Sequence, residues 1–199
     1  MHKKPFILFL IHFICLSAIA QNKVFPGYSV YNAIIRTELA DSSLSVVIVN
    51  QSEIENRSAD LVDALVNKNK EAIYYYTKGK AIDSLTQQLI ITYFKNQSKR
   101  HLTAKEFNLP VKTVLIKKKK LDKFFRLSVS DGWKNFNQQY PKSAGLFTFS
   151  KIRFSSDSSI AVFYYSHSKG GLNGHGDLVI MENADNQWRV KYLISLWQS

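Results

Sequence analysis

The sequence predicts an α+β domain in which N-terminal helices pack on a C-terminal antiparallel β-meander of about four strands, joined by one or two further strands. Three observations predict this class. Apolar residues recur at helical spacing through much of the first half, and two β-branched runs interrupt them. Four strand-like runs then follow residue 146, and the turns between them are too short to contain crossover helices.

Residues 1–20 have the three parts of a secretory signal peptide. Two lysines precede an apolar run from Phe6 to Leu16, and the small-residue pattern Ala18-Ile19-Ala20 follows it. We expect cleavage after Ala20, which leaves residues 21–199 as a single domain; a retained N-terminal anchor is the alternative. No later run is long enough to cross a bilayer, so we expect no transmembrane segment in the mature chain.

The single cysteine, Cys15, lies inside this leader. Ile14 precedes it at the position where a lipoprotein has a small residue, so we do not expect lipid attachment. The mature chain therefore has neither a disulfide nor a cysteine ligand for a metal. These observations predict a periplasmic or secreted protein that is not a lipoprotein.

The first half of the mature chain is predicted to be mainly helical. Tyr28, Tyr31, Ile35 and Leu39 share one helix face after Pro26-Gly27. A second helix starts at the N-cap Ser58 and carries Leu61, Val62 and Leu65. A third is capped by Asp83 or Ser84 and carries Leu85, Leu89 and Tyr93. The β-branched run Leu44 to Val49 predicts a buried strand between the first two helices.

The middle of the chain holds another strand and another helix. Val111 to Ile116 is a β-branched run and predicts the strand. Ser130 or Asp131 is expected to cap a helix in which Trp133, Phe136 and Tyr140 recur on one face, and Pro141 ends it. The segment from Phe124 to Val129 either pairs with the strand or leads into this helix.

The four strand-like runs of the predicted meander are Leu146 to Phe154, Ile160 to His167, Asp177 to Glu182 and Gln187 to Trp197. The last run alternates most clearly, which predicts one apolar and one polar face. The residues expected on its apolar face are Trp188, Val190, Tyr192, Ile194 and Leu196.

The chain is basic, with 27 Lys and Arg against 15 Asp and Glu and a net charge of +12. Such a surface attracts polyanions. The densest charge is the candidate binding segment Lys117, Lys118, Lys119 and Lys120, which Phe124 and Phe125 follow. We expect its partner to be an anionic envelope component or another envelope protein, and not nucleic acid. The alternative is that these lysines only keep a strand edge or hairpin solvated.

Two histidines and a carboxylate surround a predicted hairpin turn. Pairing of the strands on either side brings His167 within reach of His175 or Asp177. Imidazole and carboxylate groups are the ligands that zinc and other transition metals prefer, and a histidine beside an acid also forms a general base. The sequence thus gives a metal-site hypothesis of His167, His175 and Asp177, against the alternative of ordinary turn histidines.

The turn itself is rich in glycine. Gly170, Gly171, Gly174 and Gly176 would allow a long irregular connection with positive φ, or would present backbone N–H groups to a ligand. Phosphate-binding loops of the known kinds open a helix, whereas this loop joins two strands. A hairpin connection is therefore the preferred interpretation, with ligand contact as the alternative.

The C-terminal third carries an ordered set of pieces: Trp133-x-x-Phe136-x-x-x-Tyr140-Pro141, then Gly170-Gly171-Leu172-x-Gly174-x-Gly176, Trp188-x-Val190 and Trp197-x-Ser199. In this order the chain resembles a group of exported proteins, seen chiefly in Bacteroidetes, that have no assigned activity. Members of the group often have cysteines where this chain has Lys169 and Asn173. The resemblance implies export and an α+β fold, and it implies no reaction.

The common hydrolase signatures are missing from the sequence, among them Gly-x-Ser-x-Gly and His-Glu-x-x-His. We therefore assign no catalytic residue and expect no cofactor. Two classes of function stay open. A non-enzymatic periplasmic or envelope binding module is preferred, and a hydrolase or metal-dependent enzyme that uses the histidines of the glycine-rich loop is the alternative.

Overall fold

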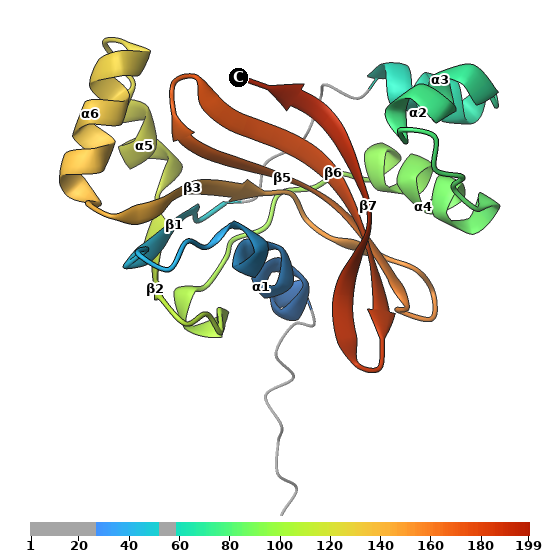
Figure 1. Cartoon of the computed structure of the whole chain (residues 1–199), viewed down its shortest axis with the longest axis horizontal. Helices are drawn as coiled ribbons and strands as arrows, with labels where there is room; N and C mark the ends of the chain where they lie inside the picture. Colours follow the sequence, from blue (N-terminus) through green and yellow to red (C-terminus); the bar gives the residue numbers. More distant parts are fainter. Residues whose placement is uncertain (1–26, 52–58) are drawn as a thin grey trace, which may run out of the picture.

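A mixed, strongly twisted β-sheet forms the centre of the molecule, and helices pack on both of its faces (Figure 1). The computed structural model describes residues 27–51 and 59–199, and in these ranges it has six α-helices and seven strands. The predicted α+β class is confirmed. The leader and the predicted cap Ser58 lie outside the described residues.

The strand order is β2-β1-β3-β5-β6-β7, with β4 paired to β5 beside β3. The four main meander strands are antiparallel, namely β3 (Ser143–Phe149), β5 (Ile160–Gly170), β6 (Asn173–Ala184) and β7 (Gln187–Gln198). The further strands are β1 (Ser45–Val49), β2 (Lys112–Ile116) and the short β4 (Arg153–Phe154). Both neighbours of β1 are parallel to it, which the sequence did not predict.

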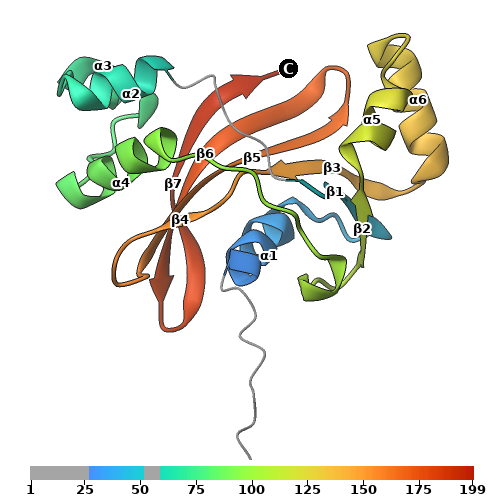
Figure 2. The same cartoon turned by 180° about the vertical axis from the view of Figure 1, so that it is seen from behind.

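One face of the sheet is covered by α1 (Gly27–Glu38), as Figure 2 shows from behind. Its buried residues Tyr31, Ile34 and Ile35 pack against alternate residues of β1, β3, β5 and β6. The helix forms as predicted because its apolar residues recur at helical spacing. It ends at Glu38, next to the β5–β6 pair.

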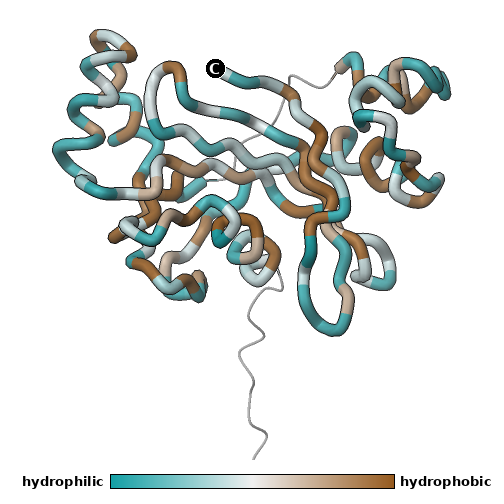
Figure 3. The backbone as a smooth tube through the Cα atoms, viewed as in Figure 1, coloured by the Kyte–Doolittle hydropathy of each residue, from teal (hydrophilic) through white to brown (hydrophobic). Residues whose placement is uncertain are grey.

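The opposite face is covered by two separate helix groups. At one end lie α2 (Ala59–Val66), α3 (Lys70–Tyr76) and α4 (Ser84–Lys95), over β5 to β7. At the other end lie α5 (Lys118–Phe124) and α6 (Val129–Gln139), over β1 to β3. A 3-10 turn (Ala104–Glu106) precedes β2. Figure 3 shows hydrophobic residues where these layers meet and hydrophilic residues along much of α3 and at the β6–β7 tip.

Helix starts were predicted with mixed success. Asp83 caps α4 as expected, with its carboxylate accepting the Thr86 N–H at 2.8 Å. The prediction that Ser130 or Asp131 caps α6 is wrong, because Ser128 accepts the Asp131 N–H at 3.0 Å. The expected strand edge or hairpin tip at Lys117–Lys120 is also wrong. Helix α5 begins there instead and buries Leu121, and Lys118 pairs with Asp122 one turn later, at 3.2 Å.

The prediction of a single apolar face on β7 is wrong as well. Register shifts leave Lys191 and Leu196 as extra residues against β6, and each bulge moves the following side chains to the other face. Ile194 and Tyr192 therefore pack under α2 to α4, whereas Trp188 packs on the α1 side. Val190 is 37% exposed.

The glycine-rich segment is a tight hairpin and not a long irregular loop. Pairing of β5 with β6 extends to Gly170 and Asn173, so only two residues turn the chain. Of the described glycines, positive φ occurs only at Gly79 and Gly145. Gly176 is required by packing instead, because a Cβ at this position would clash with the Trp197 indole. Within the described ranges, none of the helices is long and apolar enough to span a membrane.

Candidate functional site

Five polar side chains gather where the end of α1 meets the β5–β6 pair; we call Glu38, Tyr165, His167, His175 and Asp177 the polar cluster. Side chains two apart on a strand share a face, so Tyr165 and His167 point toward α1 together. In β6, His175 is the register partner of His167, and Asp177 is the partner of Tyr165. The structure thus brings together the three residues that the sequence singled out.

His167 is the most tightly held member of the polar cluster. Its side chain is 2% exposed and its ring stacks on Phe147 at a centroid distance of 4.1 Å. Nε2 lies 2.7 Å from the Ala144 carbonyl oxygen, and Nδ1 lies 2.9 Å from Oε2 of Glu38. Close approach of the β3 backbone requires Gly145, because a Cβ there would lie 2.8 Å from Nε2 of His167. Gly145 also has a φ of +117°, which only glycine adopts without strain.

The contact with Ala144 defines the protonation of one ring nitrogen of His167. A carbonyl oxygen only accepts, so Nε2 of His167 carries a proton and donates it to Ala144. Nδ1 then has two states. It holds a second proton and donates to the Glu38 carboxylate as an imidazolium, or it presents a lone pair that is free to bind a cation. The second state leaves Glu38 and Nδ1 as two adjacent electron-pair donors.

Glu38 is the last residue of α1. A carboxylate at a helix C-terminus faces the negative end of the helix dipole and is stabilised only if a cation or proton donor sits beside it. The hydrogen bond from His167 lowers the pKa of Glu38 to about 2, with a further contribution from the charges of both histidines. Glu38 is therefore an anion at every physiological pH.

The remaining three residues surround the outer side of Glu38. The Tyr165 hydroxyl lies 3.1 Å from Oε1 of Glu38 and 2.9 Å from Nε2 of His175. Burial first, and then the charges of Glu38 and Asp177, raise the pKa of Tyr165, so the phenol stays neutral. Nε2 of His175 is 3.6 Å from both Glu38 Oε1 and Asp177 Oδ2. Burial raises the pKa of Asp177, and His175 partly offsets this increase.

Three ligand atoms of the polar cluster converge in a way that suits a metal ion. One atom each from Glu38, His167 and His175 lie within 4.8 Å of one another. Zinc binds nitrogen and oxygen ligands at about 2.0–2.2 Å, which separates tetrahedral ligands by roughly 3.3–3.6 Å. The observed separations bracket this value, so shifts of about an ångström in side chains suffice to close the shell.

Two of the three residues in the predicted metal set, His167 and His175, belong to the group whose ligand atoms converge. Glu38 takes the place that the sequence hypothesis gave to Asp177, because the Asp177 carboxylate accepts a hydrogen bond from Ser195 and its Oδ2 lies 3.6 Å from Nε2 of His175. Nothing local in the sequence marks Glu38 as a ligand. The only signal was its acidic character in the last turn of a helix with no other acidic residue.

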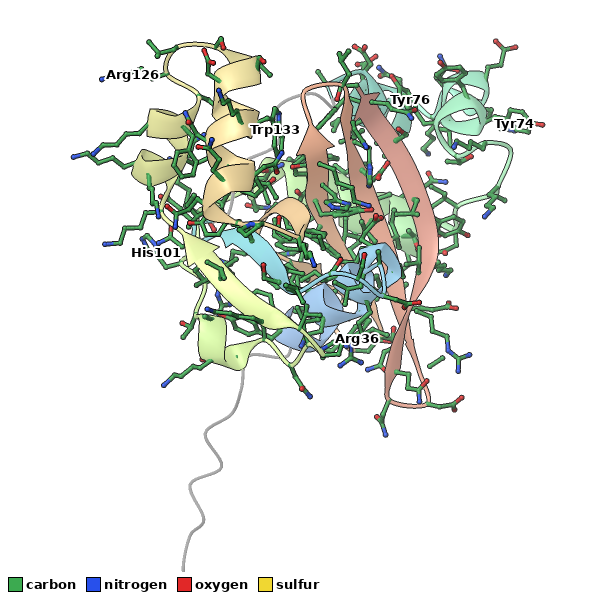
Figure 4. All side chains as sticks on the ribbon, turned by 60° about the vertical axis from the view of Figure 1, so that its left-hand side comes forward. Arg36, Tyr74, Tyr76, His101, Arg126 and Trp133 are labelled. Carbon is green, nitrogen blue, oxygen red and sulfur yellow. The ribbon has the colours of Figure 1, made fainter. Side chains whose placement is uncertain are left out.

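Of the other candidate residues, the four lysines lie away from the polar cluster, whereas Gly174 and Gly176 flank His175 in β6. Lys117 to Lys120 are exposed at the start of α5, on the opposite side of the sheet. Gly170 and Gly171 are at the tip of the β5–β6 hairpin, and Gly174 and Gly176 are inside β6. Two further groups of the kinds that bind metals also lie outside the cluster: His101 is exposed beside β2 (Figure 4), and Glu182 lies near the far end of β6.

Two hollows of the described surface lie away from the polar cluster. One of about 50 Å³ is lined mainly by residues 93–98 and 151–153, and an open one of about 540 Å³ lies over the start of β1 and β2. Neither includes a cluster residue. The polar cluster is a largely buried site whose most exposed side chain, His175, is 31% exposed. Comparisons with protein-family models, curated proteins and solved structures give no match to this chain.

Proposed function

We propose that this chain is an exported binding module whose ligand is a divalent transition-metal ion, held by Glu38, His167 and His175. The observation that carries the proposal is the convergence of three donor groups from three elements on one point. His167 is already oriented for this role, because its second ring nitrogen is fixed by the Ala144 carbonyl. Metal-binding histidines almost always have such a partner.

The donor set favours one class of metal. Two imidazoles and one carboxylate suit zinc, copper, nickel or iron, whereas magnesium and calcium prefer shells made of oxygen. Asp177 and Tyr165 add acidic and polar surroundings without entering the set of three. We therefore expect binding of zinc and no competing affinity for magnesium.

Metal binding at this site is an exchange of a cation for a proton. In the metal-free state the Glu38 carboxylate accepts the Nδ1 proton of His167 at 2.9 Å. A metal ion needs that nitrogen's lone pair, so the proton must leave. The ion then supplies the positive charge that Glu38 and the end of α1 require.

A metal-dependent hydrolase is the second candidate. Three protein ligands would leave a fourth position for water, as in catalytic zinc sites, and Asp177, 3.6 Å from His175, is the carboxylate outside the set of three that would act as its base. A hydrolase also needs a concave surface to hold its substrate, and no cluster residue lines either of these two hollows. Binding without catalysis is thus the better supported function.

Calorimetric titration with zinc chloride tests the proposal. We expect a single zinc ion per chain for residues 21–199, and a loss of at least about a hundredfold in affinity for Glu38→Gln or His175→Ala. The matched control is His101→Ala, which removes an exposed histidine far from the site and should leave binding unchanged. Equal zinc binding by His175→Ala and the unmodified chain would overturn the assignment, as would no binding at all.

A further inference from the structure

Three exposed aliphatic side chains lie at the end of the molecule that holds α5 and α6. Leu127 is 80% exposed, Val129 is 60% exposed and Leu172 is 90% exposed. We call these three residues the apolar tip. Single exposed leucines are ordinary, but a group of them at one end marks an interaction surface.

The three residues come from two different connections that touch each other. Leu127 and Val129 flank Ser128, the cap of α6, and Leu172 belongs to the two-residue turn between β5 and β6. Contact between the two is direct, since the Cβ position of Gly171 is 3.2 Å from Cγ1 of Val129 and 3.8 Å from the Trp133 ring. Figure 4 shows Trp133 between α6 and the sheet.

A rigid base supports the apolar tip. Phe125 packs edge-on against Trp133 at 5.5 Å, and Trp133 packs against the buried Phe136 at 5.2 Å. Helix α5 is thereby fixed against α6, and the short turn before the cap has little freedom. The exposed residues are therefore held outward by packing below them.

Positive charge borders the apolar tip. Residues 117–142 contain eight Lys and Arg against two Asp, a net charge of +6. Of the two acids, Asp122 pairs with Lys118 at 3.2 Å and Asp131 accepts a hydrogen bond from Ser128 at 2.8 Å. Arg126 extends away from the α5–α6 connection (Figure 4), and Lys169 is exposed on the β5 side.

We infer that the apolar tip inserts into an anionic phospholipid bilayer while the basic residues of α5 contact the lipid phosphates. Aliphatic side chains ringed by lysine and arginine match the boundary between acyl chains and headgroups. Nucleic acid is the less suitable partner, because the exposed residues of the tip are aliphatic and offer no flat ring for base stacking. The inference is independent of the proposed metal site, which lies across the sheet.

Sedimentation with lipid vesicles tests the inference. We compare vesicles of phosphatidylcholine alone with vesicles that also contain phosphatidylglycerol, and expect binding only to the latter, weakened by salt. The double variant Leu127→Ser/Leu172→Ser should bind about tenfold more weakly. Leu85→Ser is the matched control, since Leu85 is a leucine 57% exposed on α4 in the other helix group, and it should bind normally.

Charge is tested separately with Lys119→Gln/Lys123→Gln, for which we expect weaker binding to the anionic vesicles. Thermal unfolding of each variant verifies that it folds, which is expected because all the altered side chains are exposed. Three results would each overturn the inference: no binding to anionic vesicles, equal binding of the double leucine variant, or stronger binding to a duplex oligonucleotide that the leucine changes leave unaltered.

Discussion

Nδ1 of His167 lies 2.9 Å from Oε2 of Glu38, although 129 positions separate the two residues in the chain. This contact joins the C-terminal end of α1 to a strand near the middle of the sheet. It gives the helix-end carboxylate a hydrogen-bond partner and, with the Ala144 carbonyl, fixes the orientation of the His167 ring. Fold stability and the proposed metal binding would therefore depend on the same atoms.

Replacing Glu38 with Gln should lower stability in a pH-dependent way. His167 depresses the Glu38 pKa from its ordinary value of 4.5 to about 2, so the ionised side chain stabilises the fold above about pH 4.5. That contribution, up to about 3 kcal/mol, is lost as the pH falls through 2. Urea unfolding at a series of pH values should show a large deficit for Glu38→Gln at pH 7 that shrinks toward pH 2.

The control for this experiment is Glu71→Gln, because Glu71 is exposed on α3 and has no part in the cluster. Its deficit should be small at every pH. A loss of stability in Glu38→Gln that stays constant from neutral to acid pH would show that Glu38 stabilises the fold through packing and not through its charge.

Gly145→Ala should be severely destabilising, although it adds only one methyl group. The added Cβ would lie 2.6 Å from the Ser168 carbonyl oxygen and 2.8 Å from Nε2 of His167, at a φ of +117°. We expect a loss of about 3–5 kcal/mol from the two effects combined. Thermal unfolding measures it, with Gly170→Ala as the matched control, since its Cβ position meets only Asn173 at 3.9 Å.

The fold class and the main elements follow from local residue patterns. Helix α4 is predicted because Asp83 precedes an apolar helical run, and β1 because its five residues are β-branched or small and all buried. The bulges of β7 are different in kind. An extra residue in one strand is set by how the twisted β6 and β7 fit together, and no residue type at Lys191 announces it.

The candidate site was predictable only in the part that a hairpin brings together. His167 and His175 are close in sequence, and antiparallel pairing of their strands makes them partners. Glu38 reaches them through the packing of α1 on the sheet. No spacing of residues in the sequence predicts this tertiary contact. The apolar tip was missed for the same reason, because Leu127 and Leu172 meet only when two connections come together.

Trp188 and Ile194 should contribute to stability independently, contrary to the single face that the alternation predicts. The bulge at Lys191 places Trp188 with the α1 core and Ile194 with the α2–α4 core. We expect Ile194→Ala to cost about 3–4 kcal/mol and Trp188→Ala about 2–3, since Trp188 is only half-buried. In a double-mutant cycle the two losses should add within about 0.5 kcal/mol. Strong coupling between them would show that both residues lie on one face of the sheet, contrary to this prediction.

Zinc binding should release protons, and its affinity should therefore rise with pH. The Nδ1 atom that donates to Glu38 in the metal-free state is the atom that a metal must occupy, so each binding event displaces that proton. Titrations in buffers of different ionisation enthalpy count the protons released, and we expect about one per zinc ion in mildly acidic solution. His167→Gln keeps a side chain that can hydrogen-bond to Ala144 but lacks a titrating nitrogen, so it should lose both the affinity and the proton release. Zinc binding with no proton release at mildly acidic pH would show that the ion is held without displacing the Glu38–His167 contact, and would place it elsewhere in the molecule.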